Sequence, residues 1–162
     1  MSEAPDAEAD TEAGAEAGSE AGGPVRSILF ACNMNSVRSP MAEALARAAL
    51  GPRVRVESCG VHAGILDPFA AEVLTERGLA APERAPREFA EVRPEAFDLI
   101  VALTPEAAAE ARRLGARVEF WDTENPTETR GPREELLTAY RGVRDQLAAR
   151  IKARFGGSEP RG

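Results

Sequence analysis

The chain has 162 residues, with 27 acidic and 20 basic side chains and a formal net charge of −7 at pH 7. Seven carboxylates and no basic side chain fall within residues 1–24, so the rest of the chain carries equal numbers of each sign. A body without a basic surplus argues against nucleic-acid binding through a broad electrostatic patch. No apolar stretch approaches about 18 residues and no secretory signal is present, so we expect a cytoplasmic protein without membrane contact.

Composition also sets the expected domain organisation. Residues 1–24 hold no aliphatic side chain larger than alanine after Met1, so they cannot offset their ordering entropy and are predicted to form a disordered acidic tail. Residues 157–162 are predicted to be disordered as well, which leaves residues 25–156 as one domain. Two cysteines and one histidine are too few for a disulfide scaffold or a zinc site, so we expect neither metal nor cofactor.

Beyond Pro24, short apolar runs alternate with helical patterns. Strands are expected over residues 27–31, 54–60, 98–103 and 118–121. Ser39 followed by Pro40 predicts a helix capped by Ser39, and later helices are expected to begin at Asp67 and Thr104 and to run over residues 136–151. The three prolines within residues 80–96 predict an extended connection with little regular structure.

This alternation predicts an α/β fold of three layers, with a parallel sheet covered by helices on both faces. Ligands of such folds bind past the carboxyl ends of the strands.

The loop after the first strand carries the chemistry, because Arg38 follows Cys32 by six residues. A strand-to-helix loop presents unpaired backbone N–H groups to an anion, and an arginine adds a fork of donors. The same field favours a thiolate on Cys32, toward which Ser39 can direct its hydroxyl. The pattern predicts phosphoryl transfer through a cysteinyl-phosphate. The spacing alone is weak among nineteen arginines, and the alternative is a buried Cys32 with a solvated Arg38.

From Ser27 to Ile151 the chain resembles the low-molecular-weight protein tyrosine phosphatase family, whose fold includes thioredoxin-coupled arsenate reductases. The resemblance rests on ILFACNMNSVRSPMAEAL, ESCGVHA, FDLIVAL and YRGVRDQL. It implies a four-stranded sheet in flavodoxin-like order and no metal. It also implies a hydrolase acting on a phosphorylated protein or a small aryl phosphate, as a monomer or weak dimer.

The same resemblance assigns roles to residues. Cys32 is implied as the nucleophile, Arg38 as the phosphate-binding arginine and Ser39 as an aid to the thiolate. Residues 33–39 are called the cradle below, and its expected phosphate-binding members are Asn33, Met34, Asn35, Ser36, Val37 and Arg38. Asn35 is implied to hold the shape of the loop and Ser58 to brace Asn35.

The chain departs from the family pattern at several positions. The family's general acid is the aspartate of an Asp-Pro pair, where this chain has Asn125-Pro126, and an amide cannot supply that proton. Asp122 is the candidate replacement, with Glu124 on the same loop as the other, although both also fit solvated carboxylates. Met34 replaces a loop glycine. Val37 replaces a second cysteine, which leaves Cys59 as the internal redox candidate.

These departures leave three hypotheses. The first is a phosphomonoester hydrolase, and the second is a degenerate oxyanion-binding module with weak or no turnover. The third is an arsenate reductase, which would require Cys59 because residues 80–96 contain no cysteine.

Overall fold

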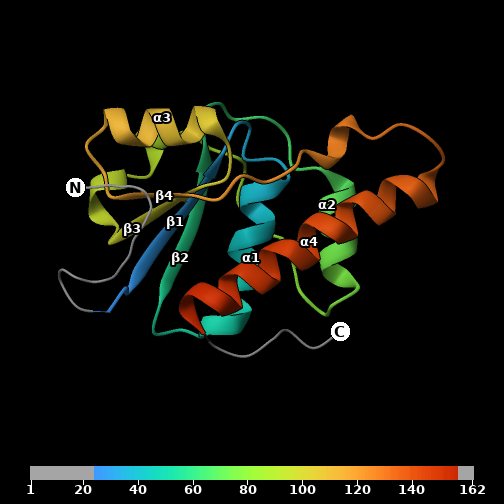
Figure 1. The fold of residues 1–162 in the computed structure, drawn as a ribbon, viewed down its shortest axis with the longest axis horizontal. Helices are drawn as coiled ribbons and strands as arrows, with labels where there is room; N and C mark the ends of the chain where they lie inside the picture. The colour runs from blue at the N-terminus through green and yellow to red at the C-terminus, as the bar shows by residue number, and fades with distance from the viewer. Residues whose placement is uncertain (1–23, 157–162) are drawn as a thin grey trace.

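The computed structural model describes residues 24–156 and contains one sheet of four parallel strands. The strands are β1 (Ser27–Cys32), β2 (Arg55–Gly60), β3 (Leu99–Ala102) and β4 (Val118–Phe120), in the order β2-β1-β3-β4 (Figure 1). The predicted α/β fold and its flavodoxin-like strand order are therefore confirmed. The tail expected over residues 1–24 lies, except for Pro24, outside the described residues, as do residues 157–162.

Helices cover both faces of the sheet, as predicted. Helix α3 (Pro105–Arg113) packs on one face, and α1 (Arg38–Leu50) and α4 (Arg133–Phe155) lie on the other, with α2 (Pro68–Thr75) beside them (Figure 1). Three short 3-10 turns complete the described elements: η1 (Phe89–Glu91), η2 (Pro94–Ala96) and η3 (Pro126–Glu128). Within residues 24–156, no helix has the length and apolar character needed to cross a bilayer.

The alternation of side chains along β1 divides the core in two. Ile28, Phe30 and Cys32 belong to the cluster shared with α1 and α4. Leu29 and Ala31 belong to the cluster shared with α3, and so does Cys59, which pairs with Ala31 in the sheet register. Because successive strand residues face opposite ways, the side chains of Cys32 and Cys59 lie on opposite faces of the sheet.

Two of the predicted helix starts are found with their caps. The Asp67 carboxylate accepts a hydrogen bond from Phe69 N at 2.8 Å, and the Thr104 hydroxyl accepts one from Ala107 N at 3.0 Å. The predicted cap of α1 is wrong, because the helix begins at Arg38 and Ser39 lies inside its first turn. The Ser39 hydroxyl is used by the loop instead, as described below.

The connection over residues 80–96 is more structured than predicted. It contains η1 and η2, and Glu88 and Glu91 form a capping box around η1. Before these turns it runs along the end of β2, where Gly60 N donates to Arg87 O at 2.8 Å and Gly60 pairs with Glu88 in an isolated parallel bridge. This connection therefore lies beside the carboxyl edge of the sheet.

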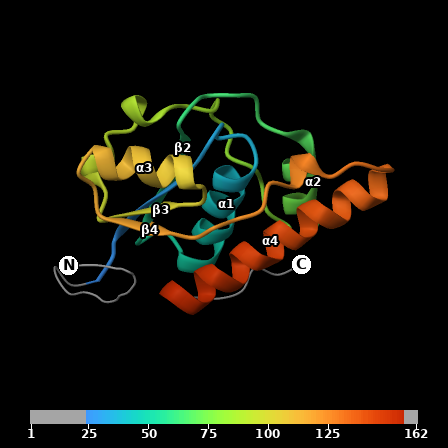
Figure 2. The same ribbon diagram turned by 45° about the horizontal axis from the view of Figure 1, so that its top comes forward.

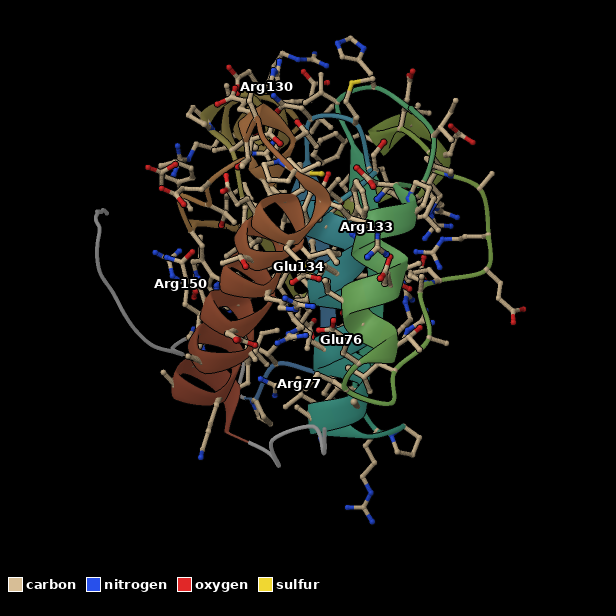
Figure 3. All side chains as sticks on the ribbon, turned by 90° about the vertical axis from the view of Figure 1, so that its right-hand side faces the viewer. Glu76, Arg77, Arg130, Arg133, Glu134 and Arg150 are labelled. Atoms are coloured by element: carbon tan, nitrogen blue, oxygen red, sulfur yellow. The ribbon has the colours of Figure 1, made fainter. Side chains whose placement is uncertain are left out.

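Ion pairs join Glu76 and Arg77, which follow α2, to α4. Figure 3 labels both residues beside α2. Arg144 of α4 is buried and donates to Val73 O at 2.9 Å and to Glu76 at 2.8 Å. Hydrogen bonds from Arg141 hold the pKa of the Glu76 carboxyl at about 2. Arg77 at the end of α2 pairs with Asp145 of α4 at 2.8 Å. These contacts hold the C-terminal end of α2 against α4.

Candidate active site

The cradle joins the end of β1 to the start of α1 at the carboxyl edge of the sheet. Its carbonyl groups are turned outward, toward residues 61–67. Val61 N donates to Cys32 O at 3.0 Å, and His62 N donates to Asn33 O at 2.7 Å. Gly64 N donates to Met34 O at 2.8 Å, and Asp67 N donates to Ser36 O at 3.1 Å. The neighbouring segment thus holds the loop from its outer side.

The backbone N–H groups of the cradle remain available. Within residues 24–156, none of the N–H groups from Asn33 to Ser39 has an acceptor. The first of these lie in the loop, and the last belong to the N-terminal turn of α1, where the helix dipole is positive. Outward carbonyls and unpaired amides at a helix start form a site for an anion.

Asn35 fixes the shape of this loop. Its backbone is left-handed, with φ of 54°, a conformation that asparagine adopts more readily than most residues. Its Nδ2 donates to Ser39 Oγ at 2.9 Å and to Ser58 Oγ at 3.0 Å, and its Oδ1 accepts from Arg87 N at 3.0 Å. Both amide protons and the carbonyl are used, so the side chain is held in one orientation.

Cys32 lies at the base of the loop with 2% of its surface exposed. Its sulfur is 3.0 Å from Ser39 Oγ, which also lies 3.1 Å from the carbonyl oxygen of Cys59. A neutral thiol donates to Ser39, whose own proton then goes to the Cys59 carbonyl. When the sulfur is ionised, the Ser39 hydroxyl turns to donate to it, so this hydroxyl suits both charge states.

Arg38 belongs to the cradle and is the first residue of α1, and its Nη1 donates to the carbonyl oxygen of Thr123 at 3.0 Å. Thr123 is buried in the segment that leads from β4 to α4, and its own N–H donates to Leu103 O at 3.2 Å. Figure 2 shows this orange segment passing in front of α1. One guanidinium nitrogen is thereby anchored, and within residues 24–156 the other N–H groups of Arg38 have no hydrogen-bond acceptor.

The two substituted cradle positions are accommodated without strain. Asn35 and Arg93 are the non-glycine residues with positive φ in the described part of the chain, so Met34 keeps an ordinary backbone. The Met34 side chain is 43% exposed, whereas Val37 is buried in the core beneath α1. The glycine that close packing requires is Gly60, since an added Cβ would lie 2.7 Å from Asn35 N.

Within residues 24–156, neither Asn125, which stands at the family's acid position, nor Asp122 forms a hydrogen bond with a residue of the cradle. The side-chain Oδ1 of Asn125 accepts from Thr127 N at 3.1 Å and from Thr127 Oγ1 at 2.7 Å, so it caps η3. Asp122 is exposed and borders a surface hollow with Arg150 and Arg154 of α4. No cradle residue lines that hollow, and Figure 3 shows Arg150 on the side of α4 turned away from α2.

Sequence reasoning missed several supports of the loop. The Thr104 hydroxyl donates to Asn33 Oδ1 at 2.7 Å and links the start of α3 to the cradle. Arg87 supports Asn35 from the 80–96 connection, and Glu43 lies fully buried behind Ser58. The one local signal was an acidic side chain, Glu43, within the small and apolar run that follows Pro40. Among residues 24–156, no cluster of three or more potential metal ligands is found.

The fold and this loop define an α/β protein with a cysteine at the base of an anion site. A family model for the low molecular weight phosphotyrosine protein phosphatases matches residues 27–153. The chain is 32% identical over 129 residues to an arsenate reductase of Bacillus licheniformis, covering 78% of this chain and 93% of that protein. It is 35% identical over 95 residues to the protein-tyrosine-phosphatase Etp of Escherichia coli, covering 57% and 64%.

A solved structure of the YwlE arginine phosphatase, a protein of Bacillus subtilis, is also similar. It superposes with a TM-score of 0.65 at 28% identity, covering 78% of this chain and 91% of that one. The chain therefore belongs to the low molecular weight phosphotyrosine protein phosphatase family.

Proposed function

We propose that this protein is a phosphomonoester hydrolase that works through a cysteinyl-phosphate on Cys32. The observation that supports it most directly is the loop between Cys32 and Arg38, the first residue of α1, whose backbone N–H groups have no acceptor within residues 24–156. In this proposal the thiolate attacks phosphorus and the ester oxygen leaves. The cradle amides and Arg38 stabilise the equatorial oxygens, and water then displaces the sulfur and releases phosphate.

A covalent intermediate is supported by the related YwlE structure, a cysteine-to-serine mutant in which the active-site serine is phosphorylated. In the present chain the Ser39 hydroxyl would stabilise the sulfur as it leaves phosphorus, because it already lies 3.0 Å from it. Both cysteines are free, which fits action in the reducing cytoplasm that we propose for it.

The substrate class follows from the protonation of the leaving group. Asn125 cannot donate a proton as a carboxylic acid would, and its side chain is engaged with Thr127. We propose that the preferred substrates are phosphate esters with weakly basic leaving groups, such as aryl phosphates, which need this assistance least. Asp122, which is exposed on the segment from β4 to α4, remains the candidate acid.

Turnover of p-nitrophenyl phosphate by the wild type and by Cys32→Ser tests the proposal. The expected result is release of phosphate by the wild type and loss of turnover in the variant, with vanadate binding retained by both. Turnover that survives Cys32→Ser would overturn the assignment.

The degenerate binding module is the second candidate, and the engaged amide of Asn125 favours it. It predicts binding of phosphate or vanadate by the wild type with negligible turnover, and a gain of activity in Asn125→Asp. A wild type that is already fast, and that Asn125→Asp leaves unchanged, would exclude it.

Arsenate reduction is suggested by the names of several relatives, among them the Bacillus licheniformis protein. Here the buried Cys59 side chain lies on the opposite face of the sheet from Cys32, so it is not placed to attack a Cys32–arsenate adduct. An external thiol would have to attack the Cys32 sulfur, releasing arsenite and leaving a mixed disulfide. Arsenate-dependent thiol oxidation that requires both cysteines would instead support the internal route.

A further inference from the structure

Behind the cradle lies a fully buried carboxylate that the proposed reaction does not use. Glu43 of α1 has no exposed surface. Its Oε1 accepts a hydrogen bond from Ser58 Oγ at 2.6 Å, and its Oε2 accepts one from Arg84 Nη1 at 2.9 Å. Arg84 Nη2 reaches Oε1 as well, so the guanidinium holds both carboxylate oxygens.

These contacts continue without a gap to the nucleophile. The Ser58 oxygen that donates to Glu43 accepts from Asn35 Nδ2, and the same Asn35 amide donates to Ser39 Oγ. The Ser39 hydroxyl in turn contacts the Cys32 sulfur. A single chain of hydrogen bonds therefore runs from Arg84, in the connection over residues 80–96, to the sulfur at the base of the cradle.

The Glu43 carboxylate, which can only accept, sets which groups donate and which accept along this chain of hydrogen bonds. Ser58 has one hydroxyl proton, and because that proton goes to the carboxylate, its lone pairs are left to accept from Asn35. A buried carboxylate requires a cationic partner, since an unpaired buried charge is costly. Arg47 also pairs with Glu43 at 2.7 Å, but its side chain is 50% exposed, against 28% for Arg84. Arg84 is thus the more shielded counter-ion and the one that spans both oxygens.

We propose that Arg84 is a positioning residue for the active site. It holds the Glu43 carboxylate in place through both oxygens, so that Ser58 accepts from Asn35 and Asn35 holds the left-handed turn of the cradle. The predicted effect of Arg84 on turnover rests on the proposed function, but its predicted effect on the reactivity of Cys32 does not. The rate at which iodoacetamide alkylates Cys32 reports the reactivity of the sulfur, whether or not the protein hydrolyses phosphate esters.

The test compares Arg84→Ala with Arg77→Ala. Arg77 is a matched control, since its side chain is 31% exposed and pairs with Asp145 far along α2 from the cradle. We expect Arg84→Ala to lower kcat for p-nitrophenyl phosphate and the Cys32 alkylation rate by about tenfold each. We expect Arg77→Ala to change only the unfolding temperature.

Chemical rescue separates positioning from loss of stability. Millimolar guanidinium chloride should restore much of the lost alkylation rate and kcat in Arg84→Ala, whereas sodium chloride at equal ionic strength should not. Arg84→Lys should retain more of both rates than Arg84→Gln. Where Arg84→Ala fails to fold, the uncharged pair Glu43→Gln with Arg84→Gln replaces it and is expected to fold with a lowered alkylation rate.

The inference is overturned if folded Arg84→Gln, or the uncharged pair, has the same alkylation rate and the same kcat as the wild type. It is equally overturned if guanidinium raises the rates of Arg84→Ala no more than those of Arg77→Ala. If the wild type does not turn over p-nitrophenyl phosphate while alkylation still responds to Arg84, the proposed function fails and the positioning role stands.

Discussion

The hydroxyl oxygen of Ser39 lies 3.0 Å from the sulfur of Cys32. This contact is the last step in the chain of hydrogen bonds that links Arg84 to the proposed nucleophile. The Asn35 amide donates to this hydroxyl from the other side. Ser39 is therefore placed to donate its proton to the sulfur whenever the sulfur carries charge, both before attack and when phosphate leaves.

Ser39→Ala removes that donor and should lower kcat for p-nitrophenyl phosphate by about tenfold to a hundredfold, the usual worth of a hydrogen bond to a charged group. Steady-state kinetics measure the change, and the rate at which iodoacetamide alkylates Cys32 should fall as well. Thr75→Ala is the control, since this exposed hydroxyl donates only to Ala71 O within α2. Equal kinetics in Ser39→Ala and the wild type would contradict the role given to Ser39.

Asn125→Asp should restore a general acid. Aspartate accepts the same hydrogen bonds from Thr127 and is a favourable cap, so η3 should be kept. For the wild type we expect kcat/KM to fall steeply as the leaving group becomes more basic. The variant should raise the rates of the slowest esters, up to the roughly 10²–10⁴-fold that general acids provide. A flat dependence in the wild type would show that another group, Asp122 or Glu124, already donates.

Burial raises the pKa of the Cys59 thiol well above its usual range, because the thiolate would be desolvated. In the unfolded chain this thiol ionises near about 8.5, so above that pH the folded state binds the extra proton and its stability falls as pH rises. The expected contribution is a loss of about 2 kcal/mol between pH 8 and 10. Urea unfolding should show this slope in the wild type and a smaller one in Cys59→Ala. Parallel pH dependence in the two proteins would count against it.

Tyr140 ties α4 to the segment beside the cradle. Its hydroxyl donates to Asp67 Oδ2 at 2.6 Å, and Asp67 both caps α2 and donates its N–H to Ser36 O. Tyr140→Phe should lower the free energy of unfolding by about 1–3 kcal/mol, since a charged acceptor loses its donor. Urea unfolding measures the loss, with Thr138→Ala, whose exposed hydroxyl bonds within α4, as the reference. A loss no larger than that of the reference would show that this hydroxyl bond adds nothing.

The sequence predicted the features that depend on residues close to one another along the chain. The helices on both faces and the loop between Cys32 and Arg38 follow from short-range patterns, whereas the strand order was anticipated only through the resemblance. The brace between Asn35 and Ser58 was anticipated only through the resemblance, and the structure brings the two side chains together.

What the sequence did not indicate depends on contacts between distant segments. Arg84 and Arg87 stand in a proline-rich connection that resembles a passive linker, and only the packed fold brings them to Glu43 and Asn35. The cap predicted at Ser39 failed for a related reason, because the hydroxyl is bound by groups from β1, β2 and the loop. In the same way, the pairing of Cys59 in β2 with Ala31 in β1 places its side chain on the far face from Cys32, which the sequence alone did not show.

The measurement that tests the central claim most directly is acid quenching of the enzyme during turnover of p-nitrophenyl phosphate, followed by mass spectrometry of its peptides. The account predicts a phosphoryl group on the sulfur of Cys32, formed within the first turnover and absent from Cys32→Ala, which should also fail to release p-nitrophenolate. A phosphoryl group on another residue, or undiminished turnover by Cys32→Ala, would contradict it.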